Sequence, residues 1–226
     1  MSEVIHSSDF ASEAAGFILD AVREGLANAD RFTLSLSGGN TPRPVYERMA
    51  VAGDIDWDRV IVTFGDERCV PADDPASNYR MANEALISRA RIPEAHVLRM
   101  RGECEPVGAA REYEAKLHAL AGTAPFFRHD LMILGLGEDG HTASLFPGSD
   151  ALDENSRWVV ETPPPKPGPA RLTMTFPIIN AARQVVFLAA GENKKPVVDA
   201  VLSGNPDPPA SRVRPGDGEV VWILGW

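Results

Sequence analysis

A short apolar segment near the middle of the chain is followed by glycines, carboxylates and one histidine. Leu131–Leu134 has the length of a buried parallel strand and is too short for a helix. Three glycines then allow a sharp turn that carries Glu138, Asp139 and His141. Open α/β sheets bind ligands beyond the carboxyl ends of their strands. Two carboxylates and an imidazole at this place make the turn the first candidate for a site of chemistry.

The same stretch allows two other interpretations. Its glycines match the G-x-G-x-x-G fingerprint of dinucleotide-binding proteins, and Glu161 follows at a suitable distance to bind a ribose hydroxyl. Against this, Glu138 and Asp139 would bring negative charge to the pyrophosphate, and Pro147 would end the following helix early. Alternatively, the loop only turns the chain and His141 is a solvated loop residue.

Composition limits the possible partners. The chain has 226 residues, of which 44% are hydrophobic, and no linker divides it, so we expect a single domain over residues 1–226. The net charge of −10 argues against nucleic acid or an anionic membrane as a partner. The 2 cysteines imply no disulfide framework, and the chain has neither a signal-peptide pattern nor a long apolar run. We therefore expect a soluble, cytoplasmic protein.

A second glycine-rich turn follows the β-prone segment Phe32–Leu36. Pro42 suits the first turn of the helix expected next, which would carry Tyr46. A strand, a turn and a helix N-terminus together form a pocket of backbone N–H groups that favours a phosphate, although an ordinary strand-to-helix turn has the same pattern. The turn lacks the Lys-Ser/Thr ending of a P-loop, so a nucleoside triphosphate is not indicated. The candidate phosphate-binding residues are Ser37, Gly38, Gly39, Asn40 and Thr41.

A third candidate turn, residues 65–71, follows the β-branched run Val60–Phe64. Its Asp66 could orient a sugar hydroxyl or act as a base, and Arg68 could bind a phosphate through two parallel hydrogen bonds. The alternative is a surface ion pair between these charged side chains. Cys69 has no partner nearby in sequence that would activate it, so we interpret it as a packing residue.

Further elements follow from hydrophobic spacing and turn residues. We expect helices over residues 8–28, 77–89, 105–120 and about 195–202, and a short helical turn over 178–182. We expect strands over 97–100, 158–162, 171–176, 184–190 and 220–224, the last of which closes the sheet. The proline-rich segment 163–169 is expected to form a stiff surface loop or a rim over the site. This alternation predicts an α/β fold with a mainly parallel sheet and helices on both faces.

Parallel strands place their carboxyl ends at one edge of a sheet, so the candidate turns can meet there. Lys194 follows the strand over 184–190 and would join them, whereas Arg171, at the start of its own segment, must reach the same edge. A phosphate-binding turn, several cations and one histidine suit a small phosphorylated metabolite.

Four motifs, in this order along most of the chain, resemble the glucosamine-6-phosphate isomerase/6-phosphogluconolactonase family. They are SGGNTP at 37–42, GDERCVP at 65–71 with SNY at 77–79, LGLGEDGHTASLFPG at 134–148, and GENK at 191–194. The resemblance implies a Rossmann-like sheet, no metal, no cofactor, and hydrolysis of 6-phospho-D-glucono-1,5-lactone to 6-phospho-D-gluconate in the pentose phosphate pathway. It also implies that His141 is the general base and that Asp139 and Asp66 belong to the reacting end. The implied phosphate-binding residues are Ser37–Thr41, Arg68, Arg171 and Lys194.

The family also contains deaminases, which carry a glutamate five residues after the histidine of this turn to open the sugar ring. Phe146 occupies that place here, so the resemblance favours the lactonases. A deaminase or isomerase and a non-catalytic sugar-phosphate-binding protein remain the alternatives. We expect a small phosphosugar lactone as the partner and a monomer or weak dimer.

A lactone is an activated ester, so its hydrolysis needs a positioned water, a base and donors for the oxyanion. A neutral His141 suits the role of base at cytosolic pH. Asp139 either orients His141 or only shapes the turn. Backbone N–H groups of either glycine-rich turn could supply the oxyanion donors.

Overall fold

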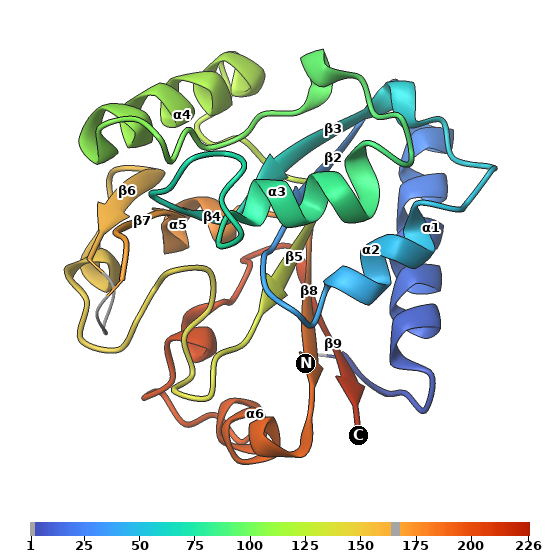
Figure 1. Cartoon of the computed structure of the whole chain (residues 1–226). Helices are drawn as coiled ribbons and strands as arrows, with labels where there is room; N and C mark the ends of the chain where they lie inside the picture. The colour runs from blue at the N-terminus through green and yellow to red at the C-terminus, as the bar shows by residue number, and fades with distance from the viewer. Residues whose placement is uncertain (1–2, 164–167) are drawn as a thin grey trace.

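The computed structural model describes residues 3–163 and 168–226, and its centre is a six-stranded parallel sheet (Figure 1). In spatial order the strands are β1 (Glu3–His6), β9 (Glu219–Gly225), β8 (Gln184–Ala190), β5 (Leu131–Gly135), β2 (Phe32–Leu36) and β3 (Val60–Phe64). Every pairing in this sheet is parallel, as predicted. The segments expected over 32–36, 60–64 and 184–190 match β2, β3 and β8 to the residue.

The helices cover both faces of this sheet, which confirms the predicted fold class. They are α1 (Phe10–Asn28), α2 (Arg43–Met49), α3 (Asn78–Ala82), α4 (Pro106–Ala121), α5 (Phe176–Ile179) and α6 (Lys195–Leu202). A π-helical turn, Asn83–Ile87, continues α3, and five short 3₁₀ turns are 57–59, 94–96, 150–153, 192–194 and 209–212. No helix within the described ranges has the length and apolar character needed to cross a bilayer.

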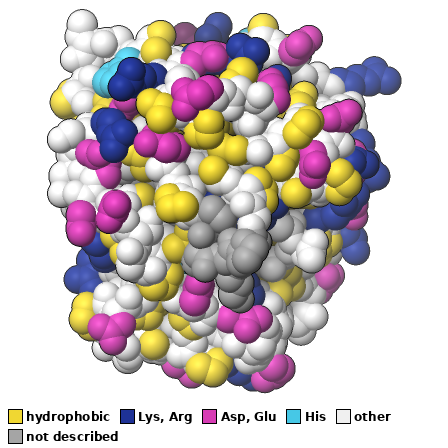
Figure 2. Space-filling view, turned by 60° about the vertical axis from the view of Figure 1, so that its left-hand side comes forward, with side chains coloured by type: hydrophobic (Ala, Val, Ile, Leu, Met, Phe, Trp, Pro, Cys, Tyr) yellow, Lys and Arg dark blue, Asp and Glu magenta, His cyan; other side chains and the backbone are white. Residues whose placement is uncertain are grey.

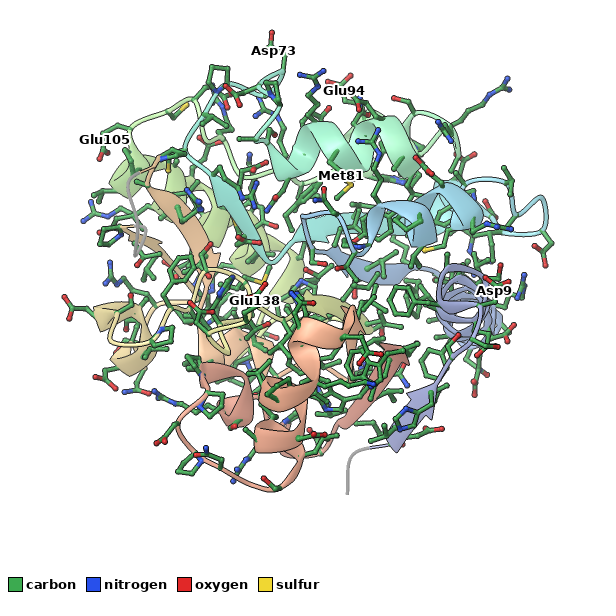
Figure 3. The ribbon with its side chains drawn as sticks, turned by 60° about the horizontal axis from the view of Figure 1, so that its bottom comes forward. Asp9, Asp73, Met81, Glu94, Glu105 and Glu138 are labelled. Carbon is green, nitrogen blue, oxygen red and sulfur yellow. The ribbon has the colours of Figure 1, made fainter. Side chains whose placement is uncertain are left out.

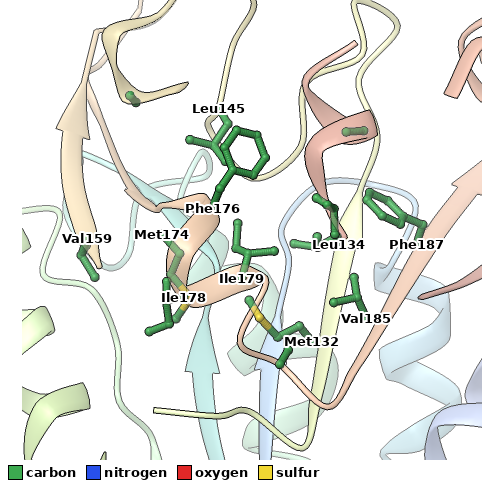
Figure 4. Close-up of a cluster of buried hydrophobic side chains, with 14 of the residues drawn as sticks. Met132, Leu134, Leu145, Val159, Met174, Phe176, Ile178, Ile179, Val185 and Phe187 are labelled. Atoms are coloured by element: carbon green, nitrogen blue, oxygen red, sulfur yellow. The ribbon is translucent and has the colours of Figure 1, made fainter. Parts of the chain in front are cut away.

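Side chains of the central strands divide between two hydrophobic clusters, one on each face of the sheet. Leu131 and Ile133 of β5 belong to the cluster under α1 and α2, whereas Met132 and Leu134 belong to the cluster under α4 and α5. Figure 4 shows the second cluster, with Met132 and Leu134 beside side chains of β8. Because successive strand residues point to opposite faces, β5 is apolar throughout and buried on both sides.

A second, three-stranded antiparallel sheet was not predicted. Its order is β4 (Asp66–Arg68), β7 (Arg171–Met174) and β6 (Val159–Thr162). The segment 65–71 was expected to be a polar turn, but its first residues pair with β7. The strands expected over 158–162 and 171–176 exist within one residue or two, yet they lie in this small sheet and not in the parallel one.

Three other expectations from the sequence were wrong. Residues 97–100 form no strand, because only Val97 bridges to Val62 of β3. The helix expected over 77–89 changes from α to π geometry at Asn83. The segment 220–224 does not close the sheet, since the four-residue strand β1 lies outside β9. The proline-rich loop expected over 163–169 falls largely outside the described residues.

Glu67 joins the small sheet to the start of α3. One of its carboxylate oxygens accepts the backbone N–H groups of Arg68 (2.8 Å) and Asn78 (2.7 Å). The other accepts the hydroxyl of Ser77 (3.0 Å) and the N–H of Tyr79 (2.8 Å). Burial raises the pKa of Glu67, and the backbone hydrogen bonds oppose this effect. The carboxylate thus fixes the backbone on both sides of the loop between β4 and α3.

Charged side chains on the surface, unlike Glu67, are exposed to solvent. On the face seen in Figure 2, acidic and basic side chains are interspersed with apolar ones. Ion pairs such as Arg80–Glu84 (2.8 Å) lie exposed to solvent. Exposed pairs contribute little to stability.

We therefore expect the Glu67→Gln variant to be clearly less stable than the wild type. A glutamine places an NH₂ group where protein donors already converge, and losing hydrogen bonds to a charged acceptor costs about 1–3 kcal/mol. Urea unfolding measures this loss, with Glu84→Gln as the exposed control that should change stability little. Equal stability of the two variants would contradict this role of Glu67.

Candidate active site

A cavity of about 210 Å³ lies at the carboxyl edge of the parallel sheet, between the chain segments that continue β2 and β5. It brings together the turn after β2, strand β4, the turn after β5 and the turn before α6. Figure 3 shows Glu138, in the turn after β5, near the middle of the view, whereas Asp9, Asp73 and Glu94 lie at the periphery. The lining residues are Ser37, Gly38, Gly39, Asn40, Thr41, Pro42, Asp66, Arg68, Asn78, Gly135, Leu136, Gly137, His141, Ala143 and Lys194.

The cavity opens where two neighbouring strands separate. β2 and β5 pair only at Leu34–Leu131 and Ser35–Met132. Past this point, the carbonyl of Leu36 still accepts the N–H of Gly65 on the β3 side (3.0 Å). Successive strand residues direct their backbone groups to opposite neighbouring strands. The backbone groups of the next residue, Ser37, therefore face the gap between β2 and β5.

Side-chain hydroxyls replace the backbone partners lost at this gap. On the β2 side, the hydroxyl of Tyr46 accepts the N–H of Ser37 (2.9 Å) and donates to its carbonyl (3.0 Å). On the β5 side, the hydroxyl of Thr142 donates to the carbonyl of Gly135 (2.9 Å). Tyr46 and Thr142 thus supply hydrogen bonds to backbone groups on the two sides of the gap.

His141 and Asp139 form a close pair at one wall. Nδ1 of His141 lies 2.5 Å from a carboxylate oxygen of Asp139, and the same oxygen accepts the backbone N–H of His141 (3.2 Å). Burial raises the pKa of Asp139, but the hydrogen bond and the charge of His141 outweigh it, so the pKa lies below its usual value. An ionised carboxylate only accepts hydrogen bonds, so in the neutral imidazole Nδ1 carries the proton and Nε2 is left as an acceptor.

Gly137 allows this pair to pack closely against the turn. A Cβ atom at Gly137 would lie 2.1 Å from Nδ1 of His141 and 2.7 Å from a carboxylate oxygen of Asp139. The turn is closed by the N–H of Gly137, which donates to the carbonyl of His141 (2.8 Å). Ala143, also in the cavity wall, has φ +48°, a left-handed backbone conformation that costs energy in a residue other than glycine.

Asp66 faces the cavity with both carboxylate oxygens already bound. The hydroxyl of Ser144 donates to one oxygen (2.7 Å), and the side-chain amide of Asn78 donates to the other (3.1 Å). Asn78 itself is 1% exposed and packs so closely on Gly38 that a Cβ there would lie 1.7 Å from its amide oxygen. The sequence-based set of site residues omitted Asn78 and Ser144. Both fall within the quoted motifs, but nothing in their type or spacing indicates that they hold Asp66.

Three cations lie in or near the cavity, and in the described part of the chain none of them pairs with a carboxylate. Arg68 donates to the carbonyl of Ala76 (2.5 Å), and its buried Nε has no partner. Lys194 donates to the carbonyl of Leu136, and burial lowers its pKa despite the opposing charges of Glu138 and Asp139.

Arg171 differs from the other two cations because it is not among the lining residues. It pairs across the small sheet with Arg68, and its guanidinium donates to the carbonyl of Pro169. Burial and the charge of Arg68 lower the pKa of Arg171. Like charges directly opposite each other on two strands are unfavourable unless an anion neutralises them.

The dinucleotide interpretation is wrong. No helix follows the turn after β5, because residues 141–149 form turns and a short bridge. Glu161 lies in β6 and lines a different hollow together with Arg157, and it is not among the residues that line the candidate site. Over the described residues, no group of three or more His, Cys, Asp or Glu side chains is placed to hold a metal ion.

Phe146 lies where the resemblance places the ring-opening glutamate of the deaminases. Its ring centroid is 4.7 Å from that of His141, and the side chain is 7% exposed. A carboxylate at this position would therefore be next to the imidazole, whereas the phenyl ring offers it only an apolar contact.

Comparisons with known proteins agree with this arrangement. Residues 6–222 match the family model for glucosamine-6-phosphate isomerases/6-phosphogluconolactonase. The chain is 42% identical over 211 residues to a 6-phosphogluconolactonase of Synechocystis, which covers 90% of this chain and 85% of the relative. It is 40% identical over 203 residues to the human 6-phosphogluconolactonase, covering 86% and 78%.

A solved structure is similar over the whole chain. The 6-phosphogluconolactonase of Thermotoga maritima superposes with a TM-score of 0.90, 32% identity and 100% coverage of both chains. The resemblance inferred from the four motifs is confirmed, and the chain belongs to the glucosamine-6-phosphate isomerase/6-phosphogluconolactonase family.

Proposed function

We propose that this protein hydrolyses 6-phospho-D-glucono-1,5-lactone to 6-phospho-D-gluconate, as the names of its relatives suggest. One observation carries the proposal. His141, which is held by Asp139, lines the same small cavity as Arg68 and Lys194, two cations that have no carboxylate partner among the described residues. A base at one wall and positive charge nearby suit an ester whose far end is a phosphate.

In the proposed reaction, Nε2 of His141 removes a proton from a water molecule that attacks the lactone carbonyl carbon. Asp139 holds Nδ1, which keeps the imidazole oriented and stabilises the imidazolium that forms. When the tetrahedral intermediate collapses, the ring C–O bond breaks and the imidazolium returns its proton to the departing ring oxygen. No covalent intermediate is required, and the product is the open-chain acid.

Asp66 is proposed to position the sugar and not to move a proton. The donors Ser144 and Asn78 already engage its two oxygens, which fixes the carboxylate in place. Each oxygen keeps a lone pair that can accept a sugar hydroxyl.

The phosphate is proposed to lie between the Ser37–Thr41 turn and the cations Arg68 and Lys194, with Arg171 behind Arg68. An anion there would relieve the repulsion between the paired arginines. The binding energy of the phosphate orients the lactone at the other end.

No observation favours the deaminase alternative, because Phe146 gives His141 no second carboxylate. A purely binding protein would not need a base held in one tautomer. A cytoplasmic location and a monomeric or weakly dimeric state stay predictions from the sequence.

We expect His141→Ala to lose almost all acceleration above the spontaneous hydrolysis of the lactone, because a general base contributes about 10²–10⁴-fold. Rates measured with the background subtracted test this, and calorimetric binding of 6-phospho-D-gluconate should be largely retained. Unchanged turnover would refute the assignment of the base. A wild type without acceleration would instead support the binding-only alternative, and release of ammonia from glucosamine 6-phosphate would support a deaminase.

The Gly137→Ala variant tests whether the close packing of the base matters. Its Cβ would lie 2.1 Å from Nδ1 of His141, so the imidazole must move. Because a misplacement of about 1 Å can cost ~10²-fold in rate, we expect kcat to fall by about 10- to 100-fold with little change in KM. The control is Gly135→Ala, another residue of the cavity wall, where a Cβ meets nothing within 4 Å. A similar kcat in both variants would contradict the proposed geometry.

A further inference from the structure

We propose that Tyr46 is a positioning residue for phosphate binding, which acts by fixing the first residue of the Ser37–Thr41 turn. The proposal rests on the proposed function, since it assigns the phosphate to this turn. Tyr46 does not line the cavity, so any effect on the ligand must pass through Ser37.

Tyr46 engages both backbone groups of Ser37. The side chain of Tyr46, from α2, is 0% exposed, and its single hydroxyl pairs with both backbone groups of Ser37. Burial raises the pKa of Tyr46, which keeps the phenol protonated and able to donate. The hydroxyl therefore occupies the place that a backbone partner would have if β2 and β5 had stayed paired.

The hydrogen bonds between Tyr46 and Ser37 connect the two ends of a short chain segment. Ser37 and Tyr46 are nine residues apart, and the whole candidate phosphate-binding turn lies between them. On the other side, Asn78 packs against Gly38 and blocks movement in that direction. The turn is thus held from two sides before any ligand arrives, which lowers the entropy lost on binding.

Without the hydroxyl, the N–H and carbonyl of Ser37 would be buried and unpaired. Buried backbone groups are rarely left without a partner, because burial removes the hydrogen bonds that they make to water in the unfolded chain. We expect the chain to move until these groups find other partners, and the turn would move with them. The reacting end would be little affected, because His141 and Asp139 belong to the turn after β5.

Tyr113 provides a matched control. It comes from α4, is 1% exposed, and its hydroxyl pairs in the same way with the N–H (2.8 Å) and carbonyl (3.2 Å) of Phe64, the last residue of β3. Phe64 does not line the cavity. Removing either hydroxyl should therefore reduce stability by a similar amount. Only the removal of the Tyr46 hydroxyl should disturb the Ser37–Thr41 turn.

The experiment compares Tyr46→Phe with Tyr113→Phe in the whole protein. For Tyr46→Phe we expect KM for the lactone, and Kd for 6-phospho-D-gluconate, to rise about 5- to 10-fold with kcat within about 2-fold, the size of one or two lost hydrogen bonds. Binding of D-gluconate, which lacks the phosphate, should be equally strong in Tyr46→Phe and in the wild type. Tyr113→Phe should leave both constants within about 2-fold. Equal KM and Kd values in the two variants would overturn the proposal.

A measurement on the wild type covers the case in which Tyr46→Phe does not fold. We expect the Ser37 amide to be protected from hydrogen exchange in the free protein, because the hydroxyl already holds it. Protection that appears only with 6-phospho-D-gluconate would overturn the proposal. If the wild type neither hydrolyses the lactone nor binds this acid, the proposed function fails first, and the inference about Tyr46 fails with it.

Discussion

The separation of β2 from β5 is the constraint on which the site depends. Two parallel strands that remain paired leave no space between them, and here pairing stops at Ser35 and Met132. Separation exposes backbone groups that must find other partners, which Tyr46 and Thr142 provide. The cavity is therefore a consequence of how the sheet ends, and its walls come from the segments that continue the two strands.

Electrostatics gives this cavity its chemical character. The chain has a net charge of −10, yet Arg68, Arg171 and Lys194 gather at one place without carboxylate partners among the described residues. Nearby carboxylates are occupied instead: Glu67 by backbone and hydroxyl donors, and Asp139 by His141. Half-buried cations without a carboxylate partner are unfavourable, and an anionic ligand would supply the missing charge.

The sequence predicted the elements whose signal is local. β2 and β3 are runs of β-forming residues bounded by turn residues, and their bounds were predicted to the residue. The short edge strand β1 and strand β4 were missed, because their pairing with β9 and β7 depends on distant segments.

The candidate site also contains some residues with a local sequence signal and others that depend on distant segments. The glycine-rich turns and His141 stand out by type and spacing, and the structure brings them together in one cavity. Asn78 and Ser144 were missed because only the fold brings them to Asp66. The most direct test is a crystal structure with 6-phospho-D-gluconate bound. The account predicts the phosphate at the Ser37–Thr41 turn and the new carboxylate beside His141, whereas a phosphate beside His141 would contradict it.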